Sequence, residues 1–365
     1  MLRISQLTDR NGNTLDYQRD PGGRLSRVSD VYGRFTTLGY GGSGLVTGLT
    51  DQAGRTVSYA YDGLGRKSSE SGFEGTTGYQ YDAANRMTRI TYPNGSLKLF
   101  EYDQKGRISK EEGDGGADRM SYAYHASSTV MTDALGRVSV QHFLDKNGVK
   151  RPVTLVDARG GVTSFEYDDN MNPTRRVDPL GRVTRFQHDA QGNVTALTDP
   201  ANGTTTTAYE ASFSQPTAVT DPRLKTTALQ YDAKGNLTLV RDDDAFETRM
   251  SYDAKGHVTR VEDPANQPTT FGYDPSNGAL NLVTDPLNRP TNMQRDALSR
   301  VTTNTDPKGK NTRFEYDTAG NLTNAIGVAL AERHSCALLG DGGVRCWGLN
   351  GTGDPYDPPT GQLGD

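Results

Sequence analysis

Residues 252–274 read YDAKGHVTRVEDPANQPTTFGYD, and this stretch decides the fold. Two turn signals, YDAKG and DPANQ, separate two short runs that are rich in Thr, Val and Phe, residues that favour β-strands. In the first turn, the aspartate side chain can accept a hydrogen bond from the backbone two residues on, and Gly256 supplies the left-handed conformation that closes a hairpin. In the second turn, the ring of Pro264 fixes the backbone φ angle that the second position of the turn requires. The stretch therefore predicts one β-hairpin between two Tyr-Asp pairs.

The Tyr-Asp pair recurs with a period of about 21 residues, which is the first property to look for in a repeat protein. The clear pairs are Tyr61-Asp62, Tyr81-Asp82, Tyr102-Asp103, Tyr167-Asp168, Tyr231-Asp232, Tyr252-Asp253, Tyr273-Asp274 and Tyr316-Asp317. The degenerate copies are Arg19-Asp20, Tyr40-Gly41, Tyr124-His125, Leu144-Asp145, His188-Asp189, Tyr209-Glu210 and Arg295-Asp296. No step between copies is shorter than 20 or longer than 23 residues, so we expect fifteen hairpins with about thirty strands.

The two strands of each predicted hairpin differ in pattern. Before the pair, side chains alternate cleanly, so that Thr312, Phe314 and Tyr316 share one face of a strand. After the pair, apolar residues fall three apart, as with Val194 and Leu197. Six residues are too few for a helix, and this spacing indicates either a β-bulge or a strand with apolar neighbours on both faces.

The composition favours a thin, soluble fold. Only 33% of residues are hydrophobic, yet the chain has 18 Tyr and 10 Phe, so aromatic residues are expected to carry most of the packing, with successive tyrosines stacked in a ladder. The 40 basic and 45 acidic residues are interleaved, which argues against nucleic-acid binding. No apolar run is long enough to span a membrane, and the first residues do not form a secretory signal.

These motifs resemble the YD (Rhs) repeats of bacterial Rhs toxins, insecticidal toxin complexes and animal teneurins over residues 1–326. The resemblance implies an all-β fold, a repetitive antiparallel β-hairpin array that forms a curved or spiralling sheet. In toxin members such a sheet is a shell around a C-terminal toxin domain, and in teneurins it contributes to cell-surface adhesion. The chain lacks the Pro- and Asp-rich core segment of the toxins, so we expect a partial, open shell from a longer product.

Residues 327–365 break the period and resemble one repeat of the bacterial regulator of chromosome condensation family, a short β-propeller-like hairpin. One repeat cannot close a propeller, so the family's nucleotide-exchange activity is not expected. The insertion DPYDPPT departs from the family pattern. A turn at Gly340-Asp341-Gly342 would place Cys336 opposite Cys346, and we hypothesise a disulfide between them in an oxidising compartment. A count of two free thiols on unreduced, secreted protein would contradict it.

No residues form a recognisable catalytic, metal or cofactor set, and we expect neither an enzyme nor a cofactor. The histidines, His125, His142, His188, His257 and His334, are scattered, and His188 and His257 stand in slots that other repeats fill with Tyr and with Asn or Arg. The acidic clusters 242–244 and 168–170 begin turns, and Glu111-Glu112-Gly113-Asp114 is expected to be a solvated loop. The glycine-rich stretch 39–44 is expected to be a turn rather than a phosphate-binding loop.

The sequence therefore predicts a structural or interaction scaffold, the wall of a shell linked to toxin delivery or cell-surface adhesion, located outside the cell or on its surface. Its expected partners are other YD repeats or a C-terminal effector domain. The alternative is a carbohydrate-binding module, which would need its Tyr and Phe side chains to face solvent. The two edge strands of an isolated array are expected to invite self-association.

Overall fold

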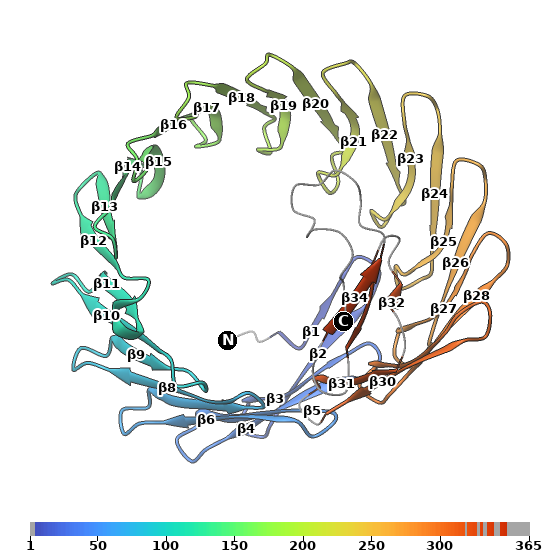
Figure 1. Cartoon of the computed structure of the whole chain (residues 1–365), viewed down its shortest axis with the longest axis horizontal. Helices are drawn as coiled ribbons and strands as arrows, with labels where there is room; N and C mark the ends of the chain where they lie inside the picture. Colours follow the sequence, from blue (N-terminus) through green and yellow to red (C-terminus); the bar gives the residue numbers. More distant parts are fainter. Residues whose placement is uncertain (1–3, 318–319, 327–328, 331–333, 339–343, 349–365) are drawn as a thin grey trace. The chain divides into compact units, whose positions relative to one another are not determined.

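The computed structural model describes residues 4–317, 320–326, 329–330, 334–338 and 344–348 (Figure 1). Thirty-one strands form one open antiparallel sheet, and the described part has no α-helix. A short 3-10 helix, η1, spans Asp114–Gly116. The expectation of an all-β hairpin array with about thirty strands is confirmed.

The strands of the large sheet are β1 (Gln6–Thr8), β2 (Thr14–Arg19), β3 (Leu25–Asp30), β4 (Phe35–Tyr40), β5 (Val46–Asp51), β6 (Thr56–Tyr61), β7 (Lys67–Gly72), β8 (Gly75–Tyr81), β9 (Met87–Thr91), β10 (Leu97–Tyr102), β11 (Ile108–Gly113), β12 (Met120–Tyr124), β13 (Ser128–Asp133), β14 (Val138–Lys146), β15 (Val149–Val156), β16 (Val162–Tyr167), β17 (Pro173–Val177), β18 (Val183–His188), β19 (Val194–Thr198), β20 (Thr204–Tyr209), β21 (Pro216–Thr220), β22 (Thr226–Tyr231), β23 (Leu237–Arg241), β24 (Glu247–Tyr252), β25 (Val258–Glu262), β26 (Pro268–Tyr273), β27 (Leu280–Thr284), β28 (Pro290–Arg295), β29 (Val301–Thr305), β30 (Asn311–Tyr316) and β31 (Leu322–Ile326).

The chain divides into two compact units. Unit 1 comprises Met1–Leu38, Thr50–Thr56 and Arg249–Asp365, and unit 2 comprises Gly39–Leu49 and Val57–Thr248. Unit 1 therefore brings together the first hairpins of the sheet and the last ones.

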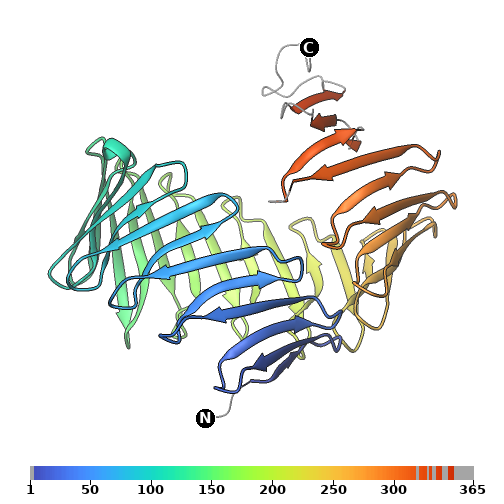
Figure 2. The same ribbon diagram turned by 90° about the horizontal axis from the view of Figure 1, so that it is seen from below.

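The turns lie in two rows because alternate turns of a hairpin array lie on the same edge of the sheet (Figure 2). Some turns lead from an odd-numbered strand to the next strand, as the turn at Asp9 does between β1 and β2. Together these turns form what we call the first rim. The second rim comprises the turns that lead from an even-numbered strand, which follow the Tyr-Asp pairs.

A β-bulge follows the turn at the clear Tyr-Asp pairs and at most of the degenerate copies, whereas the β12–β13 pair, at Tyr124-His125, has an unshifted register. In the β18–β19 pair, His188 is opposite Val194 but Gln187 is opposite Ala196, so Thr195 is an extra residue. The same register shift recurs at the end of the preceding strand in repeats from β2–β3 to β30–β31. One extra residue returns the side chain three positions on to the same face, which explains the apolar spacing of Val194 and Leu197. Of the two interpretations left open by the sequence, the bulge is correct.

The sheet is a single layer with almost no conventional core. Among the described residues, Met171 is 9% exposed, Asn236 is 8% exposed, and no side chain is fully buried. Burial alternates along strands such as β30, where Thr312, Phe314 and Tyr316 are half-buried and their neighbours exposed. The predicted thin fold is therefore observed, and stability must come from contacts between adjacent hairpins.

One sequence expectation about a loop was wrong. Glu111 and Glu112 lie in strand β11 and are half-buried. The Tyr122 hydroxyl donates a hydrogen bond to Glu111 (2.7 Å), and Lys110 forms an ion pair with Glu112 (2.8 Å). Because these partners satisfy the carboxylates, the two glutamates can lie half-buried in a strand. The sequence pattern alone had suggested a solvated loop.

A second, three-stranded sheet follows the array and consists of β32 (Ala329–Leu330), β33 (His334–Leu338) and β34 (Val344–Gly348). Strands β33 and β34 are antiparallel, and their backbone register places Cys336 opposite Cys346, as the sequence analysis expected. The turn at 340–342, the insertion at 354–360 and the last five residues lie outside the described residues. The disulfide stays a prediction.

Candidate functional site

Most turns begin with an aspartate, and its contacts form what we call the aspartate bracket. In the turn at Asp82, Oδ1 accepts the N–H groups of Ala84 (2.9 Å) and Arg86 (3.0 Å), while Oδ2 accepts Nε of Arg86 (2.8 Å). One carboxylate thus satisfies the turn backbone and fixes the side chain four residues on. The bond two residues on was predicted from the sequence, whereas the side-chain partner was not.

Three residue types close the bracket at the fourth position. Arginine closes ten turns with an ion pair, at Arg24, Arg34, Arg55, Arg66, Arg86, Arg107, Arg137, Arg182, Arg289 and Arg300. Asparagine closes five, at Asn13, Asn172, Asn193, Asn236 and Asn321. His257 closes one, with Nδ1 located 2.9 Å from Asp253 Oδ2. His257 therefore occupies the fourth turn position and has the same structural role there as arginine or asparagine in the other repeats.

The brackets hold their carboxylates ionised. For Asp62, Asp82 and Asp103 the backbone N–H of the arginine four residues on is the largest cause of a pKa below the ordinary value of 3.8. Burial raises the pKa of Asp51 and Asp296, but the hydrogen bonds from the arginine outweigh it, and the net shift is again downward. A hydrogen bond that the charged form accepts favours that form.

The tyrosine of most pairs bonds back to the preceding hairpin, whereas the Tyr252 hydroxyl donates to Met250 Sδ (4.0 Å). The Tyr102 hydroxyl donates to the Met87 carbonyl (2.5 Å), and Met87 is itself the residue opposite Tyr81 at the bulge. The same bond, fourteen to sixteen residues back, is made by Tyr61, Tyr81, Tyr124, Tyr167, Tyr209, Tyr231, Tyr273 and Tyr316. In the degenerate copy, Arg295 takes the place of the tyrosine and donates to the Leu280 carbonyl.

The bracket arginine lies over the tyrosine of the next repeat. The guanidinium carbons of Arg86 and Arg107 are 4.8 and 4.2 Å from the ring centroids of Tyr102 and Tyr124, a cation–π geometry. His257 stacks on Tyr273 in the same way, with 4.6 Å between ring centroids. The expected tyrosine-on-tyrosine ladder was therefore wrong: in these repeats an arginine or a histidine intervenes between one tyrosine and the next.

The carbohydrate-binding alternative finds no support in these tyrosines. They are half-buried, their hydroxyls are bonded to backbone carbonyls, and several carry a cation over one face. The acidic clusters also have structural partners, since Asp242 and Asp168 cap their own turns, and Asp243 and Asp169 form ion pairs with lysines. In the part of the chain that the structure describes, no group of three or more His, Cys, Asp or Glu side chains could hold a metal.

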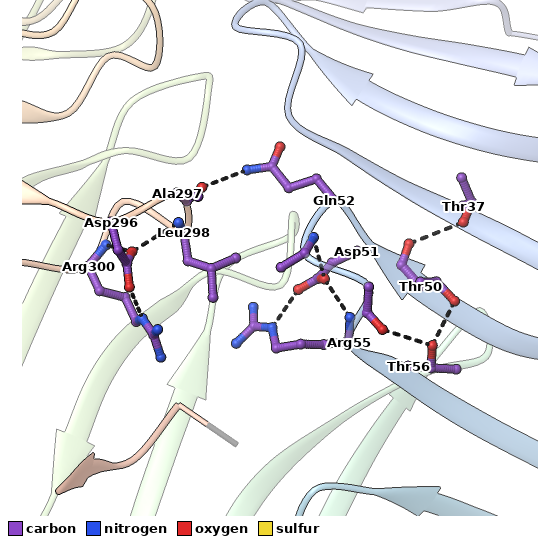
Figure 3. Close-up of polar contacts among 12 residues, drawn as sticks. Thr37, Thr50, Asp51, Gln52, Arg55, Thr56, Asp296, Ala297, Leu298 and Arg300 are labelled. Carbon is purple, nitrogen blue, oxygen red and sulfur yellow. Dashed lines mark hydrogen bonds and ion pairs between the residues drawn. The ribbon is translucent and has the colours of Figure 1, made fainter. Parts of the chain in front are cut away.

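A contact between distant hairpins is the feature that the sequence did not reveal. Within unit 1, first-rim turns at Asp9, Asp30 and Asp51 meet second-rim turns at Asp253, Asp274 and Asp296, and we call this contact the seam. The Asn13 amide donates to the Lys255 carbonyl (2.9 Å). The Gln52 amide donates to the Ala297 carbonyl (3.3 Å), and Figure 3 shows Leu298 between the brackets of the two turns.

Tyr32 and His257 form the centre of the seam. The Tyr32 hydroxyl is 3.3 Å from His257 Nε2, and the two rings stack with 6.2 Å between centroids. Burial raises the pKa of Tyr32, and the Asp253 carboxylate adds to the effect, so this tyrosine is neutral at ordinary pH. Burial also raises the pKa of Asp253, but the bond from His257 outweighs it and the net shift is downward.

Two hollows open along the seam. One of about 540 Å³ is bordered by Leu7, Leu15, Tyr32 and His257. The other, of about 340 Å³, is bordered by Val28, Phe35, Arg55 and Leu298. Both combine apolar walls with carboxylates already held in brackets, so neither offers a converging set of reactive groups.

Glycine is required at the seam for a reason beyond its backbone angle. A side chain on Gly256 (φ +86°) would overlap the Asn11 amide, and one on Gly278 (φ +69°) would overlap the Tyr32 ring. The residue at the third position of a first-rim turn thus packs directly onto a second-rim glycine. Gly309 has a similar φ of +78°, but a side chain there would point into open space.

Replacing Gly256 with alanine is therefore expected to loosen the seam. Both Gly256→Ala and its control Gly309→Ala should lose about 1 kcal/mol through backbone strain. Only Gly256→Ala should also speed hydrogen exchange of the amides around Asn11, measured by mass spectrometry. Equal exchange at Asn11 in the two variants would show that the seam does not depend on this close approach.

Comparison with known proteins agrees with the repeat pattern. The RHS Repeat model matches residues 40–77, 74–97, 170–205, 252–290 and 295–329, and the Regulator of chromosome condensation repeat model matches residues 328–353. Teneurin-3 of Mus musculus is 35% identical over 96 residues, which are 25% of this chain and 4% of teneurin-3.

Two toxin structures align with most of the chain. The crystal structure of TcdB2-TccC3 without its hypervariable C-terminal region aligns with 91% of this chain and 22% of its own, at 14% identity and a TM-score of 0.46. The Tc holotoxin pore of Photorhabdus luminescens aligns with 90% of this chain and 26% of its own, at 12% identity and a TM-score of 0.38. The chain therefore spans a small part of the length of each of these proteins.

Proposed function

Because this chain is an RHS-repeat (YD-repeat) array, we propose that it is a non-enzymatic scaffold, a wall segment of a shell linked to toxin delivery or cell-surface adhesion. The observation that carries the proposal is the repetition of the same bonds from hairpin to hairpin. The Asp, Tyr and Arg side chains that could take part in chemistry are instead used to close turns and to hold the neighbouring repeat.

The location and the partners follow from the same proposal. The resemblance of the repeats to those of toxins and teneurins supports a place outside the cell or on its surface, in a larger product that contains further repeats or a C-terminal effector domain. Among the described residues, no helix has the length and hydropathy needed to cross a bilayer.

Recovery of the protein from its source organism tests this proposal. The culture medium, the cell surface and the cell interior would be fractionated, and proteins cross-linked to the chain would be identified. We expect the chain at the surface or in the medium, linked to an effector domain or to surface receptors. Recovery from the cell interior alone, without such a partner, would contradict the proposal.

The absence of enzymatic activity is tested separately. Purified full-length chain would be assayed against ester, glycoside, peptide and phosphate substrates, and we expect no turnover above buffer. Turnover that co-purifies with the chain through several columns would refute the non-enzymatic part of the proposal without affecting its location.

A further inference from the structure

The seam shows how one rim of this array binds another. Every seam contact joins a first-rim turn to a second-rim turn: Asn11 lies over Gly256, Tyr32 over Gly278, and Gln52 donates to Ala297. The two surfaces are different, so the contact runs head to tail. It is formed by hairpins separated by 225 to 245 residues, and only part of each rim takes part in it.

The rest of the first rim carries large apolar side chains that solvent reaches. Leu135, Leu180 and Leu287 occupy the third turn position, the same position as Asn11 and Tyr32, and they are 77%, 78% and 68% exposed. Phe73, Tyr92 and Phe246 add aromatic side chains that are 48%, 41% and 57% exposed. Single exposed apolar side chains are common on protein surfaces, but these recur in turns of the rim that binds the opposite rim in the seam.

The contrast with Leu298 shows what happens when such a leucine has a partner. Leu298 also occupies the third position of its turn, with its N–H bonded to Asp296 Oδ1 (2.9 Å). Because it lies in the seam, it is half-buried beside Phe35 and Arg55. The opposite rim can therefore cover a leucine at the third turn position while the hydrogen bond from its N–H to the turn aspartate stays in place.

The second rim outside the seam offers the complementary surface. Gly44 and Gly106 occupy the turn position of Gly256, with φ of +79° and +80°. A side chain built on Gly44 would meet nothing within 4 Å, and one on Gly106 would meet only the end of Arg86 at 4.0 Å. These glycines are therefore open to a side chain from another rim, as Gly256 is occupied by Asn11.

We propose that the first-rim turns that carry Leu135, Leu180 and Leu287 dock onto second-rim turns of a second copy of this chain. The contact repeats the pairing seen in the seam: leucines at the third position pack onto turn glycines of the partner copy, and the exposed aromatic side chains of other first-rim turns add apolar contact area. Because the two surfaces are unlike, each copy keeps one rim open, and the association extends head to tail into larger assemblies rather than stopping at a symmetric dimer.

Sedimentation velocity of the full chain over a range of concentrations tests the proposal. The wild type should form a concentration-dependent series of species. The triple variant Leu135→Ser, Leu180→Ser, Leu287→Ser keeps the backbone bonds of its turns and should weaken association by at least about tenfold. A monomeric wild type at all concentrations, or a triple variant that associates equally well, would overturn the proposal.

Pairing of the edge strand β1 is the competing explanation for association. The variant Ile4→Lys places a charge beside β1, where Ile4 is 60% exposed and lies outside both seam hollows, and it should leave rim docking unchanged. Loss of association in Ile4→Lys but not in the triple variant would assign the contact to the edge strand and refute rim docking.

Cross-linking gives a readout that does not depend on variants. In a mixture of isotopically light and heavy copies, mixed cross-links should join Lys225, in a first-rim turn, to Lys105, in a second-rim turn. Mixed links confined to Lys225–Lys225 would indicate a head-to-head contact and contradict the proposal.

Discussion

Acidification below about pH 4 is expected to unfold the array in a steep transition. Among the described residues, seventeen turn aspartates have a pKa below the ordinary value of 3.8, in most of them because they accept hydrogen bonds from the turn backbone and from the fourth-position side chain. Since the unfolded chain takes up protons first, the stabilisation is complete above pH 3.8 and is lost as the pH falls through the folded-state pKa values.

Urea unfolding followed by circular dichroism between about pH 7 and pH 2.5 measures this effect. The urea midpoint should be nearly constant at higher pH and should then fall sharply. Added salt, at about 0.5 M, screens repulsion between the many positive charges at low pH but does not restore the brackets. Full recovery of stability at low pH in salt would mean that charge repulsion, and not bracket protonation, drives the unfolding.

Truncation of a single Tyr-Asp tyrosine in the middle of the array is expected to uncouple the hairpins on its two sides. Tyr102→Ala removes the bond to the Met87 carbonyl and the ring beneath Arg86, at a cost of about 3 kcal/mol. Tyr102→Phe keeps the ring and loses only the hydrogen bond, about 1 kcal/mol. Because repeat arrays are stabilised by contacts between nearest neighbours, Tyr102→Ala should also broaden thermal unfolding or split it into two steps.

Tyr92 provides the matched control. It is a turn tyrosine outside the Tyr-Asp pairs and 41% exposed, and its replacement by alanine should change the free energy of unfolding by less than about 0.5 kcal/mol. Thermal unfolding by calorimetry compares the three variants with the wild type. Equal losses at Tyr92 and Tyr102 would show that the hydroxyl-to-carbonyl bond between hairpins has no special role.

The hairpin fold was predictable because its determinants are local. The turn aspartates, the glycines and the alternation in strands such as β30 recur in every period and can be recognised within a few residues. The residue at the fourth position was visible as a recurrent Arg or Asn, but its bond to the aspartate was not inferred. The acceptor of the tyrosine hydroxyl was also hidden, because a period of 21 residues does not indicate which backbone carbonyl lies within reach.

The seam could not be predicted from one sequence. Its partners, such as Asn13 and Lys255, are 242 residues apart and belong to turns that look like all the others. The one distinctive trace is that Tyr32 is aromatic at a turn position where the other turns have leucine or a small or polar residue, and in the sequence this resembles ordinary variation between repeats. Rim contacts depend on how hairpins far apart in the chain approach each other, which a periodic pattern does not encode.

The seam has a consequence for how such a chain can change in length. The bracket and the tyrosine bond reach at most sixteen residues, so the insertion or loss of one complete hairpin in unit 2 would preserve both kinds of bond among the remaining hairpins. The same change would bring a different turn opposite Asn13, Tyr32 and Gln52. Neighbour contacts therefore permit any whole number of repeats, whereas the matched side chains of the seam select one number among them.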